Sequence, residues 1–185
     1  EHWRLTHAPP NVLAGQPTTY KDLLLGRLQA MENETLHVLQ AAAVLGETLD
    51  RSVLGSIVPG PMLSPRLTEL VERGWLVAPS PEAPKLYRFK HTLTRETIYN
   101  TLLASKRQLL HQRAAEALER LYPDSTEEYV ELLAFHYGQG GLRDKSLHYA
   151  LQAAEKSFAR HALAESLSYY QQAREALLSL ARPDL

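Results

Sequence analysis

The stretch Ser64–Val77, with the sequence SPRLTELVERGWLV, changes from a helical to a strand pattern at Gly74. Its first part places apolar side chains at helical spacing, namely Leu67, Leu70 and Val71. Ser64 is followed by a proline, which predicts an N-cap with proline at the first helical position and a helix over Arg66–Arg73. Gly74 ends this helix, and Trp75-Leu76-Val77 begins a short apolar run.

A second apolar run, Leu86-Tyr87-Arg88-Phe89, follows a tip that holds Pro79, Pro81 and Pro84. Two such runs joined by turn residues predict a β-hairpin. Further helices are expected upstream: Tyr20–Ala30 capped by Thr19, Asn33–Leu45 stopped by Gly46 in the left-handed conformation, and Arg51–Ile57 capped by Asp50. The last three of these four helices, followed by the hairpin, have the element order of a winged helix, so we expect such a domain over residues 20–91.

Proline separates the two halves of the chain, since nine of its eleven prolines precede Lys85. Proline inside a helix costs about 3 kcal/mol, so long helices are expected in the second half. Apolar spacing predicts a helix over Lys106–Tyr122 and another through Val130–Tyr137, followed by an interhelical turn at residues 138–141. Two further helices are expected over Arg143–Arg160 and Ala162–Ala181.

The last two expected helices share a pattern of small residues and tyrosines. Ser146, Tyr149 and Ala153 are echoed twenty residues later by Ser166, Tyr169 and Ala173. Small residues seven apart let helices approach closely, and tyrosines fill the remaining gaps, as in TPR-like pairs that stack into a solenoid. The predicted fold is therefore mainly α: a winged-helix domain with a small β-hairpin, junction helices over residues 92–122, and TPR-like helical repeats over residues 123–185.

Composition excludes several classes of protein. The chain has 185 residues, a formal net charge of -1 and no cysteine, which rules out disulfides, thiolate metal sites and a cysteine nucleophile. Near-neutral charge argues against a protein that coats nucleic acid by charge alone. The longest apolar runs are far shorter than the roughly 20 residues that span a bilayer, so no membrane association and a cytoplasmic location are expected. Glu1, with no initiator methionine, indicates a fragment of a larger protein.

The sequence holds no recognisable catalytic or metal motif. It has no phosphate-binding loop of the form G-x-x-x-x-G-K-[ST] and no G-x-S-x-G. No H-E-x-x-H or H-x-x-x-H pair occurs among its eight histidines, which lie on different expected elements: His2, His7, His37, His91, His111, His136, His148 and His161. We therefore expect a non-enzymatic fragment that binds neither a metal nor another cofactor.

A specific resemblance covers nearly the whole chain. Residues 36–46 (LHVLQAAAVLG) and 67–77 resemble the region behind the nucleotide-binding module of STAND-type signalling ATPases, which include LuxR-type and SARP-type regulators and class III adenylate cyclases. Residues 87–99 (YRFKHTLTRETIY) are similar to their "F-x-H … R-E-x-x-Y" segment. Its "R-x-x-L-H … A-x-x-L-E" continuation is matched by Arg107, His111 and residues 114–119. Residues 134–137 and 147–154 resemble the start of the family's helical tail.

The resemblance implies what neighbours this fragment. Trp3-Arg4-Leu5, Pro17 and Arg27-Leu28 match the end of a preceding lid and its linker, which we assign to residues 1–19. ATP and Mg²⁺ would then bind in an upstream ATPase domain of the same chain, which is one expected partner. A protein or small-molecule inducer on the helical face is the other. The fragment would couple nucleotide state to partner or inducer sensing without catalysis.

Five residues at the junction are candidates for interdomain coupling: His91, Arg95, Tyr99, Arg107 and His111. His91 precedes the expected helix at Thr92, which favours a local capping role. Arg107 and His111 lie one turn apart on a helix face, where two cations would repel weakly and favour either an acidic partner or a neutral imidazole. Two interpretations stay open for Arg95, Arg107 and His111: structural packing, or a polar relay between the ATPase and the helical tail.

A DNA-binding winged-helix regulator is the alternative function, and an enzyme fragment comes third. In the DNA-binding case Arg66–Arg73 would lie near the recognition position, and Lys85, Arg88 and Lys90 on the hairpin would add positive charge. Arg66 and Arg73 are balanced by Glu69 and Glu72, however, so that helix has no net charge. Entry into a DNA groove needs several phosphate contacts at once, so DNA is not the expected partner.

Overall fold

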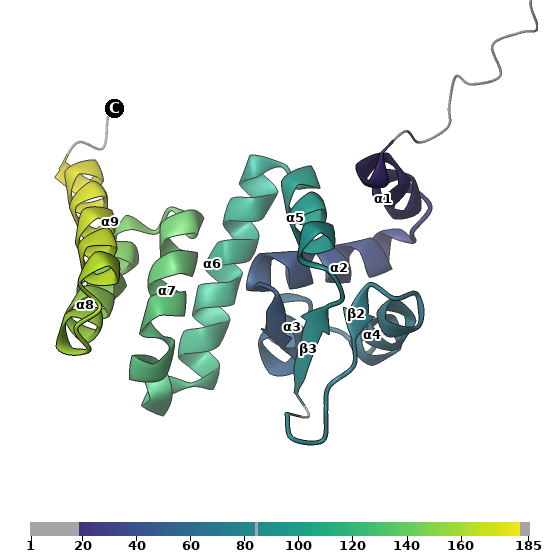
Figure 1. Cartoon of the computed structure of the whole chain (residues 1–185), viewed down its shortest axis with the longest axis horizontal. Coiled ribbons are helices and arrows are strands. Elements are labelled where there is room, and N and C mark those ends of the chain that lie inside the picture. The colour runs from purple at the N-terminus through teal and green to yellow at the C-terminus, as the bar shows by residue number, and fades with distance from the viewer. Residues whose placement is uncertain (1–18, 84, 182–185) are drawn as a thin grey trace, which may run out of the picture.

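The computed structural model describes residues 19–83 and 85–181, apart from the Ser125 side chain. This part of the chain holds nine α-helices, one 3₁₀ helix and a three-stranded antiparallel sheet (Figure 1). The chain is mainly helical, as predicted. The lid and linker expected over residues 1–19 lie outside the described residues except for Thr19, and Pro84 of the hairpin tip lies outside them as well.

The N-terminal half combines four helices with the sheet. Its elements are α1 (Tyr20–Gln29), α2 (Asn33–Leu45), β1 (Thr48–Asp50), α3 (Arg51–Ile57), α4 (Leu63–Glu72), β2 (Leu76–Val77) and β3 (Leu86–Phe89). The predicted hairpin is confirmed, with Leu76 opposite Phe89. Strand β1, which the sequence analysis missed, pairs with the other edge of β3 and puts Leu49 opposite Tyr87.

Two of the four expected helices in this half have the N-caps that the sequence predicts. Thr19 and Asp22 form a reciprocal capping box at the start of α1, and the Asp50 carboxylate accepts a hydrogen bond from the Ser52 backbone N–H at the start of α3. Helix α2 has the predicted bounds. Gly46 follows it with a φ of +130° and a ψ of −167°, so its positive φ is confirmed but its left-handed helical conformation is not.

Helix α4 begins earlier than predicted. Ser64 is not its N-cap: the helix starts at Leu63, the cap position is Met62, and no side chain caps it. The Ser64 hydroxyl instead accepts a hydrogen bond of 2.7 Å from Arg51 of α3. Pro65 is tolerated because the first-turn N–H groups of a helix have no intrahelical partner. The helix ends at Glu72, one residue before the predicted end, with Arg73 as its C-cap; Gly74, the predicted stop, follows with a φ of +73°.

The C-terminal half is entirely helical where it is described. Its elements are α5 (Thr92–Thr101), α6 (Ala104–Leu121), a 3₁₀ turn (Pro123–Ser125), α7 (Thr126–Gly140), α8 (Arg143–Ala159) and α9 (Leu163–Ala181). The four expected helices are present, although α6 begins two residues before Lys106. Each of α6 to α9 packs against the next, so that they form a continuous row across Figure 1.

The expected turn at residues 138–141 is shifted towards its end. Gly138, Gln139 and Gly140 belong to α7, and only Gly141, with a φ of +71°, lies in the turn. Gly140 is needed because a Cβ there would lie 2.9 Å from the Gln112 Cγ of α6. Its carbonyl accepts hydrogen bonds from the Gln108 and Gln112 amides. The glycine therefore lets the end of α7 pack directly on α6.

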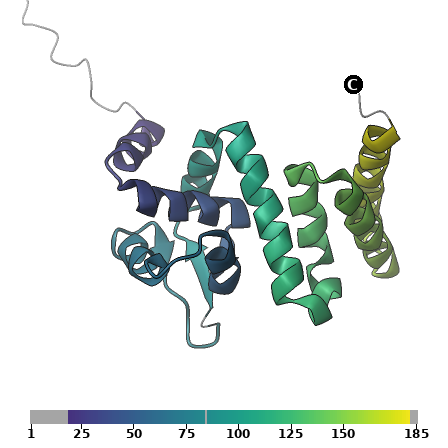
Figure 2. The same ribbon diagram turned by 180° about the vertical axis from the view of Figure 1, so that it is seen from behind.

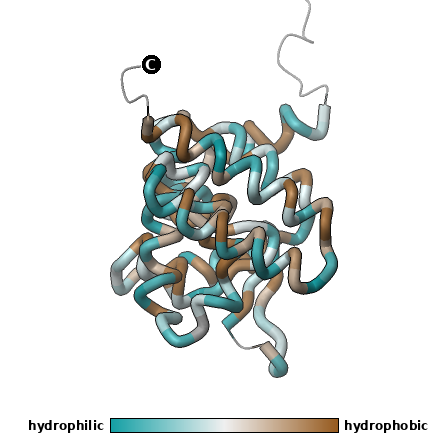
Figure 3. The backbone as a smooth tube through the Cα atoms, turned by 90° about the vertical axis from the view of Figure 1, so that its left-hand side faces the viewer, coloured by the Kyte–Doolittle hydropathy of each residue, from teal (hydrophilic) through white to brown (hydrophobic). Residues whose placement is uncertain are grey.

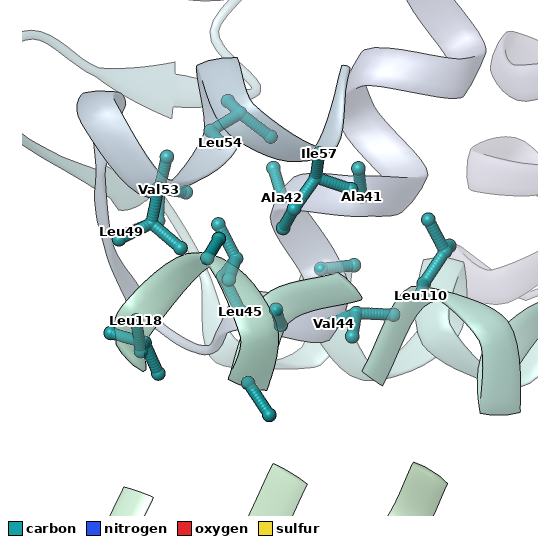
Figure 4. Packing of buried hydrophobic residues seen from close by; sticks show 14 of the residues in the cluster. Ala41, Ala42, Val44, Leu45, Leu49, Val53, Leu54, Ile57, Leu110 and Leu118 are labelled. Atoms are coloured by element: carbon teal, nitrogen blue, oxygen red, sulfur yellow. The ribbon is translucent and has the colours of Figure 1, made fainter. Parts of the chain in front are cut away.

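One hydrophobic core runs through both halves. Leu110 and Leu118 of α6 lie against apolar side chains of α2, β1 and α3, as Figure 4 shows; those labelled there are Ala41, Ala42, Val44, Leu45, Leu49, Val53, Leu54 and Ile57. Seen from the front and from behind, α6 stands between the sheet-containing half on one side and α7, α8 and α9 on the other, and α5 lies on the side of the sheet (Figures 1 and 2). Helix α6 is therefore shared by the two halves.

Hydrophilic and hydrophobic residues alternate along the helices (Figure 3). This alternation is typical of helices that bury one face and expose the other. Among residues 19–83 and 85–181, no helix combines the length and the apolar character that a membrane span requires.

Gly74→Ala tests the conformation that ends α4. At a φ of +73° an alanine costs about 1–2 kcal/mol of unfolding free energy, although its Cβ would have room, since the nearest atom lies 3.8 Å away. Gly26→Ala in α1 is the matched control, because a Cβ there meets nothing within 4 Å and the backbone is helical. Urea unfolding should show that Gly26→Ala stabilises the protein by about 0.5–1 kcal/mol. Equal effects of the two substitutions would contradict this explanation.

Candidate functional site

The bend between α5 and α6 brings four of the five predicted coupling residues together. We call the group formed by Arg95, Tyr99, Arg107, His111 and His136 the junction cluster. Arg95 and Tyr99 lie one turn apart on α5, Arg107 and His111 one turn apart on α6, and His136 comes from α7. The cluster therefore lies where the N-terminal half meets the helical row.

Tyr99 is the centre of this cluster. The Arg107 guanidinium lies 4.4 Å from the centroid of the Tyr99 ring, and that of Arg95 lies 5.9 Å from it. The Tyr99 hydroxyl is hydrogen-bonded to His111 Nε2 at 2.9 Å. A ring that contacts a cation on its face and an imidazole at its hydroxyl joins α5 to α6 through two different interactions.

Backbone carbonyls at helix ends hold the two arginines. Arg95 donates to the carbonyl of Ala43, in the last turn of α2, at 3.3 Å. Arg107 donates to the carbonyl of Leu102, at the bend, at 3.2 Å. Because the C-terminal end of a helix carries partial negative charge, a cation on α2 is electrostatically favourable. Arg95 thus connects the core helix of the N-terminal half with the cluster.

A buried histidine pair extends the cluster into α7. His111 Nδ1 and His136 Nδ1 lie 2.8 Å apart, and neither side chain is accessible to solvent. The sequence analysis missed this pair because 25 residues separate its members and no motif links them. The available signal was that both histidines fall among apolar residues at helical spacing, which indicates burial but not pairing.

Tyr99, His111 and His136 form a chain of two hydrogen bonds, and the donor in one bond determines the donor in the other. One Nδ1 must donate to the other, and two neutral imidazoles can share a single proton there. If His111 donates at Nδ1, its Nε2 accepts from the Tyr99 hydroxyl; if His136 donates, His111 Nε2 donates to that hydroxyl. His136 Nε2 has no hydrogen-bond partner among the described residues. Reversing the direction therefore changes the protonation of all four ring nitrogens of the two histidines together.

Burial keeps both histidines neutral. Burial and the charge of Arg107 lower the pKa of His111 from 6.5 to about 4. Burial and proximity to His111 lower the pKa of His136 to about 3. Of the two possibilities expected next to Arg107, the neutral imidazole agrees with this direction. Burial lowers the pKa of His111 more than Arg107 does, and spacing alone does not indicate it.

His91 stands apart from the cluster. It occupies the N-cap position of α5, but its side chain makes no capping hydrogen bond and is exposed. The predicted capping role of its side chain is therefore wrong, because an imidazole at this position reaches none of the free N–H groups of the first turn. Thr92 contacts the N-terminal half here instead, since its hydroxyl donates to Glu47 at 3.1 Å.

A groove of about 540 Å³ lies beside the cluster, between α7, α9 and the start of α8. We call it the α7–α9 groove. Neutral polar side chains make up much of its lining, with one cation, one anion and one exposed aromatic ring: Gln139, Gln171, Gln172, Ser168, Ser179, Arg143, Glu175 and Phe135. The Phe135 ring packs edge-on against His111, with centroids 5.5 Å apart, and against His136, at 5.3 Å. One side chain therefore contacts both the histidine pair and the groove.

Two polar contacts fix the walls of the groove. The Gln172 amide of α9 donates to the Ala134 carbonyl of α7 at 2.7 Å, and Gly138 leaves room for it, since a Cβ there would lie 2.7 Å from that amide nitrogen. Arg143 of α8 donates to the Ser179 carbonyl at the end of α9 at 2.8 Å. The groove is consequently held open by contacts between the three helices rather than by a loop.

A second polar group holds α8 against α6. Glu119 accepts hydrogen bonds from Lys145 and from the Tyr149 hydroxyl, and the rings of Tyr137 and Tyr149 stack with centroids 5.5 Å apart. Burial and Glu119 raise the pKa of both tyrosines, so they stay protonated. The expected packing role of the small residues and tyrosines is consistent with these contacts, since Ser146, Ala153, Ser166 and Ala173 are buried.

The side chains of the junction cluster and of the α7–α9 groove can form hydrogen bonds and cation–π contacts. Within residues 19–83 and 85–181, no three histidine, aspartate or glutamate side chains are grouped so as to hold a metal ion. The buried histidines contact each other, Tyr99 and Phe135, and no serine or carboxylate in the described part of the chain hydrogen-bonds to either one. The arrangement is that of a rigid polar connection beside a groove.

Comparison with known proteins gives one weak similarity. The chain is 27% identical over 170 residues to a Rhizobium meliloti (strain 1021) protein named uncharacterized protein R02095. The match covers 90% of this chain but only 16% of that relative, so the chain spans about one sixth of the relative's length. No family model matches the sequence, and no solved structure matches the chain.

The histidine pair should make stability depend on pH. In the folded protein the two histidines stay neutral down to pH 3–4, whereas in the unfolded chain they become protonated below their pKa of 6.5. Between these pH values unfolding therefore takes up protons. The unfolding free energy should therefore fall as pH falls from 6.5 towards 5, approaching about 1.4 kcal/mol per pH unit for each histidine. His37, whose pKa is lowered by burial, Lys106 and Arg113, adds in the same direction.

Urea unfolding between pH 7 and pH 5 measures this dependence. His136→Gln should reduce the slope because it removes one of the groups, whereas the exposed His91→Gln should leave it unchanged. The range ends at pH 5 to keep carboxylates out of the measurement. Stability is also contributed by three carboxylates with lowered pKa values, Glu69, Glu119 and Glu131, and this contribution is lost only below about pH 4.3. A slope that is equal in all three proteins would contradict the assignment.

Tyr99→Phe should cost about 1–3 kcal/mol of unfolding free energy. The substitution keeps the ring beneath Arg107 but removes the hydroxyl, and so leaves His111 Nε2 buried without its partner. Tyr129→Phe is the matched control: its ring stacks on Tyr122 at 4.7 Å, and its hydroxyl has no hydrogen bond to a described residue. Guanidinium chloride unfolding of both variants at pH 7 should separate them, and a silent Tyr99→Phe would exclude a stabilising hydrogen bond.

Proposed function

We propose that this chain is a non-catalytic regulatory segment of a STAND-type signalling ATPase or transcriptional regulator. In this proposal residues 20–91 form a winged helix that contacts the nucleotide module, and residues 123–185 form TPR-like repeats that bind a partner or inducer. Residues 92–122 couple the two. The segment itself carries out no reaction, and ATP and Mg²⁺ bind elsewhere in the whole protein.

The element order in the N-terminal half supports the winged-helix assignment. Strand β1 lies between α2 and α3, and the hairpin β2–β3 follows α4 and completes a sheet in the order β1-β3-β2. A short sheet packed beside three helices, with a hairpin as its last element, is the architecture that name describes. Arg27 supports a fixed position for α1, because it donates to the Arg73 carbonyl at 2.9 Å and lies over the Trp75 ring at 4.3 Å.

The packing of the helical row supports the TPR-like assignment. Consecutive helices are joined by short turns, and α8 and α9 pack on each other along the pattern of small residues that the sequence shows twice. The Ser166 hydroxyl donates to the Ala154 carbonyl of α8, which brings the two backbones close together. Close helix pairs that repeat along one direction are typical of solenoid repeats.

The observation that carries the proposal is the double role of α6. Through Leu110 and Leu118 this helix belongs to the core of the N-terminal half. Through His111 it is hydrogen-bonded to α7, whose Phe135 lines the α7–α9 groove. A displacement of the N-terminal half therefore moves one wall of the groove, and a partner in the groove favours one position of that half. Such coupling requires different affinities for the two states.

Helix α4 does not favour the DNA-binding alternative. Arg66, its best-placed cation, is bound to Glu32 at 2.6 Å, Glu34 at 3.0 Å and Glu69 at 3.3 Å. A phosphate would have to displace three carboxylates from this guanidinium. In a mobility-shift assay on duplex DNA, sequence-selective binding tighter than about 10⁻⁸ M would favour the alternative over our proposal.

Unfolding followed by two probes tests the coupling. In a Trp3→Phe background, Trp75 fluorescence reports on the N-terminal half, because this buried ring lies next to α4. Far-ultraviolet circular dichroism reports on the helices, most of which belong to the C-terminal half. We expect coincident urea transitions. We also expect Arg107→Ala to lower the unfolding free energy by about 1–3 kcal/mol with both probes. Arg113→Ala, at an exposed position on the same helix, should change it with neither probe.

Separate transitions, with Arg107→Ala silent in both, would reject a rigid connection and with it the proposed coupling. The non-catalytic part is tested by calorimetry with Mg·ATP. We expect no heat of binding and no release of phosphate, and micromolar affinity or hydrolysis would contradict it.

A further inference from the structure

A second groove lies between the first turns of α2 and the turn that joins α3 to α4. It has a volume of about 420 Å³, and all of its lining lies between residues 33 and 66. We call it the α2–α4 groove. Apolar side chains make up more than half of its lining, namely Val38, Val58, Pro59, Pro61, Met62 and Leu63. A groove of this size, mainly apolar with a few polar groups, is typical of sites that bind a small molecule.

Contacts within the chain fix the walls of the α2–α4 groove. The two prolines of the turn restrict its backbone, because the proline ring fixes φ. Helix α3 lies close to the turn, since a Cβ at Gly55 would lie 3.2 Å from Leu63 Cδ2. On the other side, the Thr35 hydroxyl of α2 donates to Glu69 of α4 at 2.8 Å. Met62 is 49% exposed, so the formed groove offers a ligand apolar surface to cover.

The α4 side of this groove does not favour an anion. Arg66 lines that side, but its guanidinium is already bound at 2.6–3.3 Å to three carboxylates, those of Glu32, Glu34 and Glu69. Glu34 is itself part of the lining, and its side chain is 68% exposed. A second anion placed here would be repelled by carboxylates that already neutralise the arginine.

The α6 side carries two cations that no described carboxylate binds. Lys106 is hydrogen-bonded to the neutral amide of Gln40 at 2.7 Å, and Arg113 has no hydrogen bond or ion pair with a described residue. Burial and the charges of Lys106 and Arg113 lower the pKa of His37, which lines the groove. The two cations therefore act on the groove itself and make the potential beside His37 positive.

A smaller hollow of about 230 Å³ continues the groove towards α6. Pro59 lines both of them. The charged side chains of the hollow are Arg113, Arg120 and Glu116, so it holds one cation more than it holds anions. Glu116 weakens the attraction for an anion without cancelling it. An anion beside Pro59 is consequently favoured, whereas the same anion at the α4 side is not.

We propose that the α2–α4 groove binds a small amphipathic carboxylate, a molecule with an apolar body and one carboxylate group. Its apolar body covers Val58, Met62 and Leu63, and its carboxylate lies beside His37 and Arg113. Arginine suits this group because its guanidinium can donate two parallel hydrogen bonds to a carboxylate. A polyanion such as a nucleic acid fits less well, since Glu34 and Glu116 flank the site. The proposal stands independently of the proposed regulatory function.

Calorimetry at pH 7 with octanoate and the 185-residue chain tests the site. We expect a Kd below about 1 mM. Octylammonium has the same apolar body with the opposite charge, and acetate has the carboxylate without the body. Each should bind about tenfold or more weakly than octanoate, because each lacks one of the two interactions. Absence of octanoate binding, or equal affinity for octylammonium, would overturn the proposal.

Substitutions on the two parts of the site separate their contributions. Met62→Glu should abolish octanoate binding by placing a carboxylate on the apolar wall, whereas Met62→Leu should retain it. Arg113→Ala should weaken binding about tenfold, and Arg88→Ala, at an exposed cation outside the groove, is its matched control. Circular dichroism checks that all variants are folded. Octanoate affinity that is unchanged in both Met62→Glu and Arg113→Ala would show that octanoate binds elsewhere and would contradict the assignment.

Histidine-ring NMR tests on which side the carboxylate lies. Beside His37 the bound carboxylate opposes the charges of Lys106 and Arg113, so saturating octanoate should raise the pKa of His37. With the carboxylate at the α4 side, octanoate would mainly bury His37 further and lower its pKa. The exposed His91, outside the groove, should titrate as it does without octanoate. A pKa of His37 that falls or stays constant on binding would exclude the proposed orientation.

Discussion

The structure depends on one helix that is buried on two sides. Leu110 of α6 faces the core of the N-terminal half, and the next residue, His111, faces α7. Because adjacent residues on a helix point about 100° apart, a single turn of α6 reaches both neighbours. Small residues make this possible, since Ala114, Ala115 and Ala117 bring the neighbouring backbones close. Helix α6 therefore joins the core of the N-terminal half to α7, and α5 adds further contacts with α2.

The polar residues of the junction cluster lower the stability of the fold in a way that leucines at the same positions would not. His136 Nε2 and the Nε atoms of Arg95 and Arg107 are buried without a partner among the described residues. Each such atom opposes folding by about 1–3 kcal/mol. In return, the directional bonds among Tyr99, His111 and His136 allow few relative positions of α5, α6 and α7, whereas an apolar contact would allow many. A connection that transmits displacement needs such restriction.

Local signals in the sequence were sufficient for most of the helices. The capping box at Thr19, the Asp50 cap and Gly74 each act within four residues, so the pattern contains the whole cause. Strand β1 could not be found in this way: it is too short for the alternation of its three residues to indicate a strand, and its partner β3 lies almost forty residues later. Ser64 failed as a cap because Arg51, on another helix, binds its hydroxyl.

The candidate site likewise combines residues that local sequence signals indicate with residues that only distant packing brings in. Arg95, Tyr99, Arg107 and His111 lie on two consecutive helices that the sequence predicts, and the bend between these helices brings the four residues together, whereas their coupling role stays a prediction. His136 and the α7–α9 groove depend on how α7 packs, which in turn depends on Gly140 accepting two glutamine amides from α6. Such packing involves residues about thirty positions apart, and no repeat or motif marks it.

The short connections between α6, α7, α8 and α9 also have a kinetic consequence. Contacts in this row join elements that are neighbours in the chain, whereas the sheet must bring β1 to β3 across α3, α4 and the β2 strand. Chains with local contacts cross their folding barrier sooner than chains that must first close long loops. The helical row can therefore form early. The apolar side of α6 then serves as the surface on which α2 and α3 condense and the strands find their register.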